Sequence, residues 1–230
     1  MPRTPYAPNV RAIARILSRL YHDFPHYNRR NPLEEILFII CSIQTDERGY
    51  RATFRDLRRR FSRFSQLASA PEHAIAETIA KGGLSRQKAS AIKKLLTAVI
   101  TRFGRPTLEP LRKLPDDECE AILTSLPGVG KKVARCVMMY SLDRKVFPVD
   151  THCWRICRRI GWVRKTRANG MCSPRDMDRL QTKIPPDVRF SLHVNMVSLG
   201  REICITPQPK CSLCPLSRFC RKIQVRRPLV

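Results

Sequence analysis

Lys132 and Asp150 are the two residues whose type and setting could support covalent chemistry on a substrate. Lys132 lies in a predicted helix over 130–141, at the border of its apolar stripe and level with Cys136 and Tyr140. A lysine whose stem lies against apolar surface loses solvation, and its pKa falls toward the range that an amine nucleophile requires. Periodicity alone favours the ordinary alternative, which is a surface lysine that keeps its ammonium in water.

Asp150 stands where the apolar segment 146–149 ends and a predicted helix over 151–161 begins. A carboxylate in this place is a good N-cap, because it accepts a hydrogen bond from an unpaired amide in the first helical turn. Capping by itself is the ordinary role of such a residue. A capping carboxylate beside a cleft is also ionised and fixed in direction, so it can stabilise a developing positive charge.

A glycine-rich turn joins the predicted helices over 116–124 and 130–141, with the sequence Leu126-Pro127-Gly128-Val129-Gly130-Lys131-Lys132-Val133-Ala134. Two glycines permit positive φ and a close approach of the backbone to a ligand, and the following helix offers unpaired amides and the positive end of its dipole. This combination indicates a phosphate cradle, although a Gly-x-Gly turn taken alone is more often a tight connection. We expect Leu126 and Val129 to hold the turn by apolar contacts, and Lys131 and Arg135 to share an open face.

Four of the ten cysteines gather near the end of the chain, in the pattern Cys204-x6-Cys211-x2-Cys214-x5-Cys220. In a chain without a secretory signal, such a group indicates metal binding and not disulfides. A four-thiolate zinc site and an iron–sulfur cluster are both chemically reasonable for these ligands. The other six cysteines are scattered, and several fall on apolar faces where a free cysteine behaves as a small hydrophobe.

The composition indicates a polyanionic partner. The 230 residues include 44 Lys and Arg against 19 Asp and Glu, which gives a formal charge of +25. Such a surplus attracts nucleic acid and disfavours self-association, so we expect a monomer that binds nucleic acid. A solubilising surface or a membrane-surface protein is the alternative, but the basic residues are interspersed with acids and do not form one amphipathic tail.

Hydropathy argues against a membrane or secreted protein. No apolar run approaches the roughly 20 residues that span a bilayer. The first residues contain no apolar core of the secretory kind. We therefore expect an intracellular protein, cytoplasmic and nucleoid-associated if its source is bacterial or archaeal.

Helical periodicity dominates the whole chain, and alternating Val/Ile/Thr-rich segments are scarce, so the predicted fold class is all-α. Gly- and Pro-containing breaks separate the elements. The predicted helices are 9–23, 32–43, 47–60, 64–67, 71–80, 85–103, 107–113, 116–124, 130–141, 151–161, 173–182 and 186–199. No linker or repeat separates two halves of the chain. We therefore expect that any second domain is not a separate stretch of sequence but packs together with the first.

These motifs together resemble one family. Residues 126–134, followed by Val149-Asp150-Thr151-His152 with Asp150 placed 18 residues after Lys132, are similar to the helix-hairpin-helix and catalytic loop of the endonuclease III branch of DNA glycosylases. The four-cysteine spacing resembles the one by which that family holds a [4Fe–4S] cluster. The resemblance covers about residues 30–220. It implies two helical subdomains with the active site in the cleft between them: a six-helix barrel over 26–144 that contains the hairpin, and a second subdomain formed by 1–25 plus 145–230.

The resemblance extends to two loops. Residues 83–89 resemble the family's loop that inserts an apolar residue into the duplex, and residues 42–46 resemble its Gln-bearing loop. It implies that Leu84 and Gln44 fill the gap left by an extruded nucleotide, and that Thr45 and His152 lie near the pocket or the opened strand. His152 could equally be a residue that only packs at its helix start. The implied phosphate-contacting residues are Gly128, Val129, Gly130 and Lys131.

The function that this resemblance implies is base excision repair of DNA that contains a damaged base. Lys132 would attack C1′ as a neutral amine with help from Asp150, and β-elimination would follow, which makes the enzyme a bifunctional glycosylase and AP lyase. The expected substrates are oxidised or otherwise damaged pyrimidines. A shortened Gln loop and Cys153, found where a branched aliphatic residue is common, are departures that bear on the substrate base. The alternatives are a monofunctional glycosylase, a non-catalytic damage sensor and a zinc-stabilised binding module.

Overall fold

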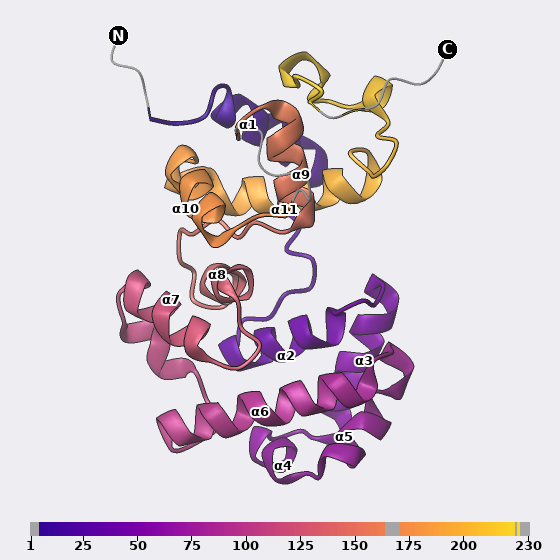
Figure 1. Ribbon diagram of the computed structural model, residues 1–230, viewed down its shortest axis with the longest axis vertical. Coiled ribbons are helices and arrows are strands. Elements are labelled where there is room, and N and C mark those ends of the chain that lie inside the picture. Colours follow the sequence, from indigo (N-terminus) through magenta and orange to yellow (C-terminus); the bar gives the residue numbers. More distant parts are fainter. Residues whose placement is uncertain (1–4, 164–170, 224, 226–230) are drawn as a thin grey trace. The chain divides into compact units, whose positions relative to one another are not determined.

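The computed structural model describes residues 5–163, 171–223 and 225, and every regular element in these ranges is helical (Figure 1). The predicted all-α class is therefore confirmed. The chain divides into two compact units, one formed by residues 27–144 and the other by residues 1–26 together with 145–230. None of the described helices is long and apolar enough to cross a membrane.

The unit of residues 27–144 is built around α2, which packs against α3, α6 and α8. Its helices are α2 (Pro32–Ser42), α3 (Glu47–Arg60), α4 (Phe64–Ser69), α5 (Glu72–Thr78), α6 (Ser85–Phe103), α7 (Asp116–Ser125) and α8 (Lys131–Tyr140). Phe38 of α2 makes edge-to-face contacts with Tyr50 and Phe54 of α3, at centroid distances of 5.2 and 5.3 Å. α2 is central because most of its residues are apolar and buried, so it can accept neighbours on several sides.

The second unit is built around α11, which packs against α1 and α9. Its helices are α1 (Val10–Tyr21), α9 (Thr151–Ile160), α10 (Pro174–Lys183) and α11 (Arg189–Glu202). Every residue of α11 from Leu192 to Gly200 is buried, and Leu17 of α1, Trp154 of α9 and Leu180 of α10 belong to the same core. Residues of the first and last thirds of the chain therefore share one core.

The predicted helix boundaries differ from the structure mainly where prolines occur. The segment 107–113 was expected to be an α-helix, but Glu109–Lys113 is a 3-10 helix with a proline in its first turn. A 3-10 helix, Pro186–Val188, also precedes α11, which starts at Arg189 and continues three residues beyond the predicted end at 199. Proline lacks the amide that an α-helical ladder needs, so short tight turns replace regular helix at both places.

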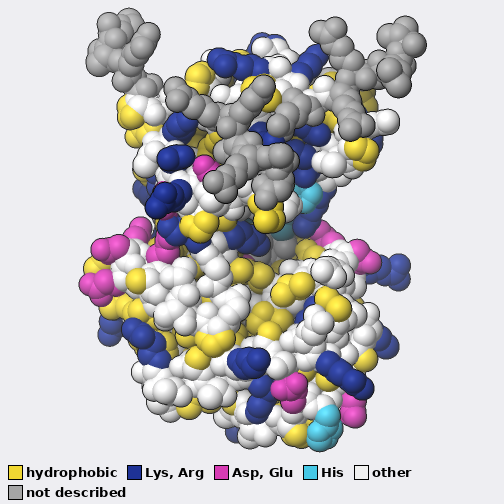
Figure 2. All heavy atoms as spheres, viewed as in Figure 1, with side chains coloured by type: hydrophobic (Ala, Val, Ile, Leu, Met, Phe, Trp, Pro, Cys, Tyr) yellow, Lys and Arg dark blue, Asp and Glu magenta, His cyan; other side chains and the backbone are white. Residues whose placement is uncertain are grey.

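Lysine and arginine side chains are visible on both units in the space-filling view (Figure 2). Basic residues outnumber acidic ones in the sequence, 44 against 19, which gives the formal charge of +25. The acidic side chains cannot neutralise all of this positive charge. The surface charge is therefore strongly positive.

Candidate functional site

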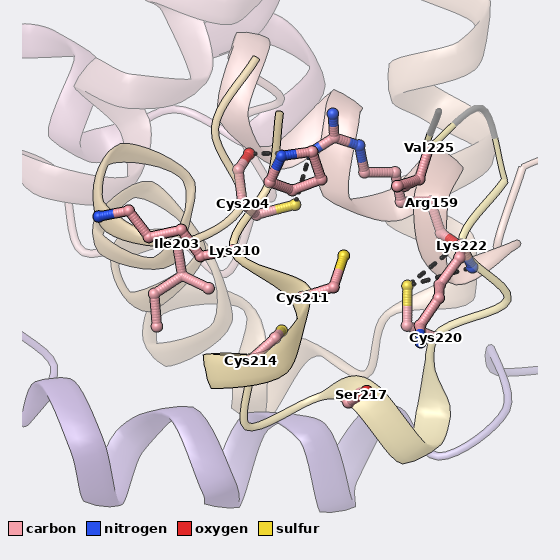
Figure 3. A pocket seen from close by; sticks show the side chains of 11 residues that line it. Arg159, Ile203, Cys204, Lys210, Cys211, Cys214, Ser217, Cys220, Lys222 and Val225 are labelled. Atoms are coloured by element: carbon pink, nitrogen blue, oxygen red, sulfur yellow. Dashed lines mark hydrogen bonds between the residues drawn. The ribbon is translucent and has the colours of Figure 1, made fainter. Parts of the chain in front are cut away.

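The four clustered cysteines line one pocket in the segment that follows α11 (Figure 3). Two 3-10 helices, Cys211–Leu213 and Ser217–Phe219, fold this segment into tight turns, and all four thiols are half-buried. The guanidinium of Arg159 donates from Nη1 to Cys204 Sγ at 3.1 Å and to Ile205 O at 2.9 Å. Within the described ranges, no group of three or more His, Cys, Asp or Glu side chains is arranged to hold one metal ion. Four thiols around one pocket, with a cation beside them, are a donor set that would suit a [4Fe–4S] cluster, which four cysteine thiolates hold.

In the glycine-rich turn between α7 and α8, one of the two glycines adopts positive φ, whereas Gly130 has a φ of −82°. Gly128 adopts a φ of 76°, in the left-handed region that glycine occupies without strain. Leu126 and Val129 are buried, and the Val129 amide donates to Leu126 O at 3.1 Å, so both residues hold the turn from inside. Gly130 is the N-cap of α8, so the turn leads directly into a helix N-terminus.

Lys132 is half-buried in the first turn of α8. Cys136 and Tyr140, which lie in line with it on the same helix, are both buried. The stem of Lys132 is therefore at the edge of the helix face that enters the core, as the periodicity predicts.

The expectation of an open face for Lys131 and Arg135 is wrong for Arg135. Arg135 is only 2% exposed, and its Nε donates to Glu120 Oε2 of α7 at 2.9 Å. Lys131 Nζ lies 3.1 Å from the other oxygen of the same carboxylate. Glu120 therefore binds two cations and fastens α8 to α7, a long-range contact that the periodicity of α8 does not reveal.

A buried carboxyl lies within electrostatic range of Lys132. Glu35 of α2 is fully buried, and its Oε2 accepts a hydrogen bond from the Arg29 amide at 2.6 Å. Among the described residues, its Oε1 has no hydrogen-bond partner. Burial raises the pKa of Glu35 to about 8, although the Arg29 amide and the charges of Lys132 and Arg29 lower it. The Glu35 carboxyl is therefore protonated, and so neutral, in most molecules at pH 7.

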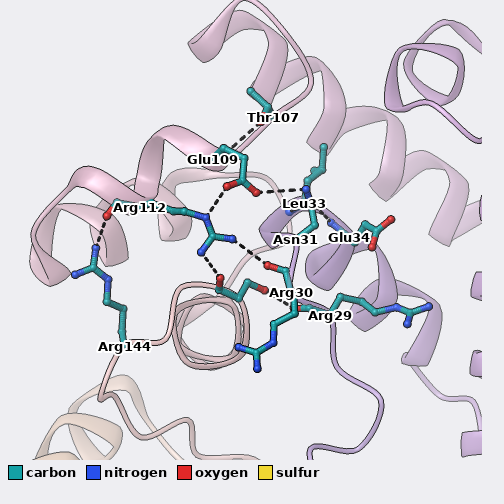
Figure 4. Close-up of polar contacts among 10 residues, drawn as sticks. Arg29, Arg30, Asn31, Leu33, Glu34, Thr107, Glu109, Arg112 and Arg144 are labelled. Atoms are coloured by element: carbon teal, nitrogen blue, oxygen red, sulfur yellow. Dashed lines mark hydrogen bonds and ion pairs between the residues drawn. The ribbon is translucent and has the colours of Figure 1, made fainter.

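Local contacts fix the start of α2, which carries Glu35 (Figure 4). The side chain of Asn31 accepts hydrogen bonds from the amides of Leu33 and Glu34, both at 3.0 Å, and so caps the helix. Arg112 donates to Arg30 O at 3.1 Å and to Ser141 O, just after α8, at 2.7 Å. The beginning of α2 and the end of α8 are thereby held by the same guanidinium.

Asp150 is the N-cap of α9, as its position in the sequence predicts. Its Oδ1 accepts a hydrogen bond from the Cys153 amide at 2.7 Å, which fixes the direction of the carboxylate. The Cys153 thiol is buried 3.5 Å from His193 Nδ1, and that nitrogen lies 2.9 Å from Pro148 O. Burial raises the pKa of Cys153 well above its ordinary value, and the Asp150 charge raises it further, so this thiol stays neutral.

His152 packs at the start of α9 against the backbone of Gly200. A Cβ at Gly200 would come within 2.6 Å of His152 Cβ, so glycine is required at this contact. The imidazole Nδ1 lies 3.0 Å from Arg155 Nη2. Burial lowers the pKa of His152, and the Arg155 and Arg201 charges lower it further against the opposing charge of Asp150. His152 is therefore mostly neutral at pH 7.

Gln44 and Leu84 lie on two turns of the first unit that contact each other. Both residues adopt positive φ, 49° for Gln44 and 48° for Leu84. Thr45 Oγ1 is 2.7 Å from Gly82 O and so joins the two turns. The structure thus brings together Gln44, Thr45 and Leu84, which are far apart in the sequence.

Comparison with known proteins shows the family of this chain. The family model of the HhH-GPD superfamily base excision DNA repair protein matches residues 37–180, which is more than half of the chain. The chain belongs to the HhH-GPD superfamily. It is 31% identical over 187 residues to endonuclease III of Buchnera aphidicola subsp. Baizongia pistaciae, with 81% of this chain and 80% of that protein covered. Within this superfamily, the chain is similar to endonuclease III over most of its length.

Two further comparisons are with a plant relative and with a solved structure. It is 33% identical over 172 residues to a candidate DNA glycosylase of Arabidopsis thaliana, with 75% of this chain covered. The chain spans 57% of the length of that relative. A solved structure of a trapped endonuclease III–DNA covalent intermediate matches with a TM-score of 0.77 at 25% identity, covering 93% of this chain and 95% of that one.

Several polar residues that the HhH-GPD fold buries were not predicted from the sequence, among them Glu35, Lys88 and His193. A signal was available for Lys88, because it shares helical spacing with Ile92, Leu95 and Val99 on the buried face of α6. Glu35 and His193 lie in helices that are buried on most sides, so periodicity carries little information about them.

Proposed function

We propose that this chain is a bifunctional base-excision-repair enzyme, a DNA glycosylase with β-elimination AP lyase activity on oxidised or otherwise damaged pyrimidines in double-stranded DNA. The observation that best supports this proposal is a half-buried lysine, Lys132, in the first turn after the Gly-x-Gly hairpin. Asp150, a carboxylate of fixed direction, follows in the capping position of α9. The similarity to an endonuclease III that was trapped in a covalent complex with DNA also supports it.

In the proposed reaction, the lone pair of Lys132 Nζ forms a bond to C1′ of the damaged nucleotide. The C1′–N bond to the base breaks, and its electron pair leaves with the base. The Asp150 carboxylate stabilises the positive charge that develops on the sugar and accepts the proton that the amine releases. Opening of the sugar ring gives a Schiff base between Lys132 and C1′.

Strand cleavage follows from this Schiff base. Loss of a proton from C2′ breaks the C3′–O bond, and the 3′ phosphate leaves with the bonding electrons. Water then hydrolyses the Schiff base and frees the lysine. An enzyme without an amine at this position would remove the base and stop at the abasic site, so Lys132 decides between the bifunctional and the monofunctional reaction.

DNA is proposed to bind through charge and backbone amides. The +25 charge attracts the duplex, and the amides of Gly128, Gly130 and Lys131 at the start of α8 bind a phosphate. The target nucleotide must leave the stack before C1′ is accessible. Gln44 and Leu84 fill the space that it vacates, and Thr45 and His152 lie near the opened strand.

The decisive experiment is borohydride trapping on duplex oligonucleotides that contain an oxidised pyrimidine. The wild type should give a covalent adduct, Lys132→Gln should give none, and Asp150→Asn should give little. Lys94→Gln, at an exposed lysine of α6, is the matched control and should trap as well as the wild type. Base removal without any adduct would identify a monofunctional glycosylase. Damage-specific binding with neither activity would identify a non-catalytic sensor.

The substrate base is tested by a panel of thymine glycol, dihydrouracil, uracil and adenine opposite 8-oxoguanine. Excision of the first two and not of the others is the expected result. Excision of adenine alone would overturn the proposed preference for damaged pyrimidines.

We also propose that Cys204, Cys211, Cys214 and Cys220 hold a [4Fe–4S] cluster. When bound, the cluster ties this segment into a loop that presents Lys210, Arg218, Arg221 and Lys222 to the DNA backbone. Purified protein should be brown, absorb near about 400 nm and contain iron, as expected for iron–thiolate charge transfer. Colourless protein that contains zinc and no iron would overturn this assignment.

A further inference from the structure

Lys88, in the first turn of α6, is a buried lysine that the proposed reaction does not use. Its side chain is 2% exposed, and burial lowers its pKa. Its ammonium donates hydrogen bonds to Cys41 O at 3.0 Å, Gly82 O at 2.8 Å and Thr45 Oγ1 at 2.7 Å. An ammonium has three N–H donors, so all of them are satisfied. Such complete satisfaction is what a buried charge requires, and it holds the ammonium in one place.

The three acceptors belong to two chain segments that are far apart in the sequence. Cys41 and Thr45 flank the turn between α2 and α3, whose residues 43–45 we call the Gln tip. Gly82 begins the turn that leads into α6, whose residues 82–84 we call the Leu tip. Thr45 Oγ1 adds a direct contact between the tips, since it lies 2.7 Å from Gly82 O. Lys88 therefore bonds to both tips at once.

Both tips are exposed at their apolar ends and constrained at their bases. Ile43 is 47% exposed and Leu84 is 39% exposed. Gln44 and Leu84 both have positive φ, which is unfavourable for residues with a side chain and needs support from surrounding contacts. At the base of the Leu tip, a Cβ on Gly82 would lie 2.5 Å from Thr53 Oγ1, so the backbone there is pressed against α3.

We propose that Lys88 is a positioning residue that fixes the Gln tip and the Leu tip relative to one another, so that both enter the opened duplex as one unit. This inference rests on the proposed function, in which Gln44 and Leu84 fill the gap left by the extruded nucleotide. Two separately mobile tips would each lose conformational freedom on binding, and that loss weakens the complex. A buried ammonium bonded to both tips removes this loss before DNA arrives.

Two variants test the inference, and a third is the matched control. Lys88→Met keeps the length of the side chain and removes all three donors. Thr45→Val keeps the shape of the side chain and removes the hydroxyl that bonds to Lys88 and Gly82. Lys93→Met is the control, because Lys93 also lies on α6 and also donates to backbone carbonyls, those of Ala68 and Ala70, which are in neither tip.

The measurement is the ratio of two affinities, for a duplex with a tetrahydrofuran abasic-site analogue and for the same duplex without damage. Lys88→Met should weaken binding to the abasic duplex by about tenfold or more and change binding to the undamaged duplex by less than about twofold. Thr45→Val should lower the ratio in the same direction by a smaller factor. Lys93→Met should keep the wild-type ratio. A loss of folded protein would lower both affinities together, so the ratio separates positioning from general destabilisation.

The inference is overturned if the variants at Lys88 and Thr45 keep the wild-type ratio, or if Lys93→Met lowers it as much. If Lys88→Met does not fold by circular dichroism, Lys88→Gln takes its place, because a glutamine amide has two donors and cannot satisfy all three acceptors. A wild-type protein that does not distinguish the two duplexes would refute the proposed gap filling itself. A wild-type protein that distinguishes them without forming a borohydride adduct would remove the lyase proposal and leave the role of Lys88 standing.

Discussion

Glu35→Gln is expected to change how the stability of this protein depends on pH. Glu35 is fully buried, and burial raises the pKa of its carboxyl to about 8 from an ordinary value of 4.5. Between these two values the native chain keeps a proton that the unfolded chain releases. Each pH unit in this window therefore lowers the free energy of unfolding by about 1.4 kcal/mol. This contribution to stability is complete below pH 4.5 and is lost as the pH rises to about 8.

Glutamine at position 35 isolates this effect. It has nearly the same volume as glutamate, its carbonyl oxygen can accept the hydrogen bond that the Arg29 amide now makes at 2.6 Å, and it does not titrate. The stability of Glu35→Gln relative to the wild type should therefore rise by about 1.4 kcal/mol per pH unit from pH 5 to pH 8 and stay level above that. Urea denaturation at constant ionic strength, at five pH values from about 5 to 9, measures the difference.

Glu34→Gln is the matched control for this experiment. Glu34 is the neighbouring carboxylate on α2, and it is paired with Arg58 Nε at 3.1 Å near the surface. Its substitution removes the same functional group from the same helix and leaves Glu35 in place, so its stability curve should run parallel to that of the wild type. A Glu35→Gln curve that is parallel to the wild type from pH 5 to pH 8 would refute the assignment of a raised pKa to Glu35.

Three further predictions follow from local geometry and charge. Gly128→Ala should destabilise the chain by about 1–2 kcal/mol in thermal unfolding because φ is 76°, whereas Gly130→Ala, at a φ of −82° with open space, should change stability by less than about 0.5 kcal/mol. Asp46→Ala should cost about 1 kcal/mol by the same assay, because the Gly49 amide loses the capping oxygen now 2.7 Å away. Affinity for undamaged duplex should fall by about 10³-fold or more between about 50 and 200 mM salt in fluorescence anisotropy, and a salt-independent affinity would contradict binding through phosphates.

The helices themselves were predictable because their signals are local. Apolar spacing, prolines and glycines located α6 at residues 85–103 and α3 at residues 47–60, and the structure has these same limits. The segment 107–113 was less predictable, because a proline in a short helix shifts the balance to a 3-10 turn without changing the apolar pattern. Contacts made within a few residues thus explain why the limits of α3 and α6 were predicted correctly and why the 3-10 helix in segment 107–113 was not.

Sequence alone determined the features of this protein that depend on short-range order. The Asp150 cap, the left-handed turn at Gly128 and the cysteine spacing each involve residues close together in the chain, so their geometry follows from residue types and intervals. Only the tertiary structure decided which polar groups are buried and what they meet. Glu120 of α7 binds Arg135 of α8, and Lys88 joins two turns, because helices distant in sequence pack together there. The energy of a charge depends on the atoms that replace water around it, and those atoms come from other parts of the chain.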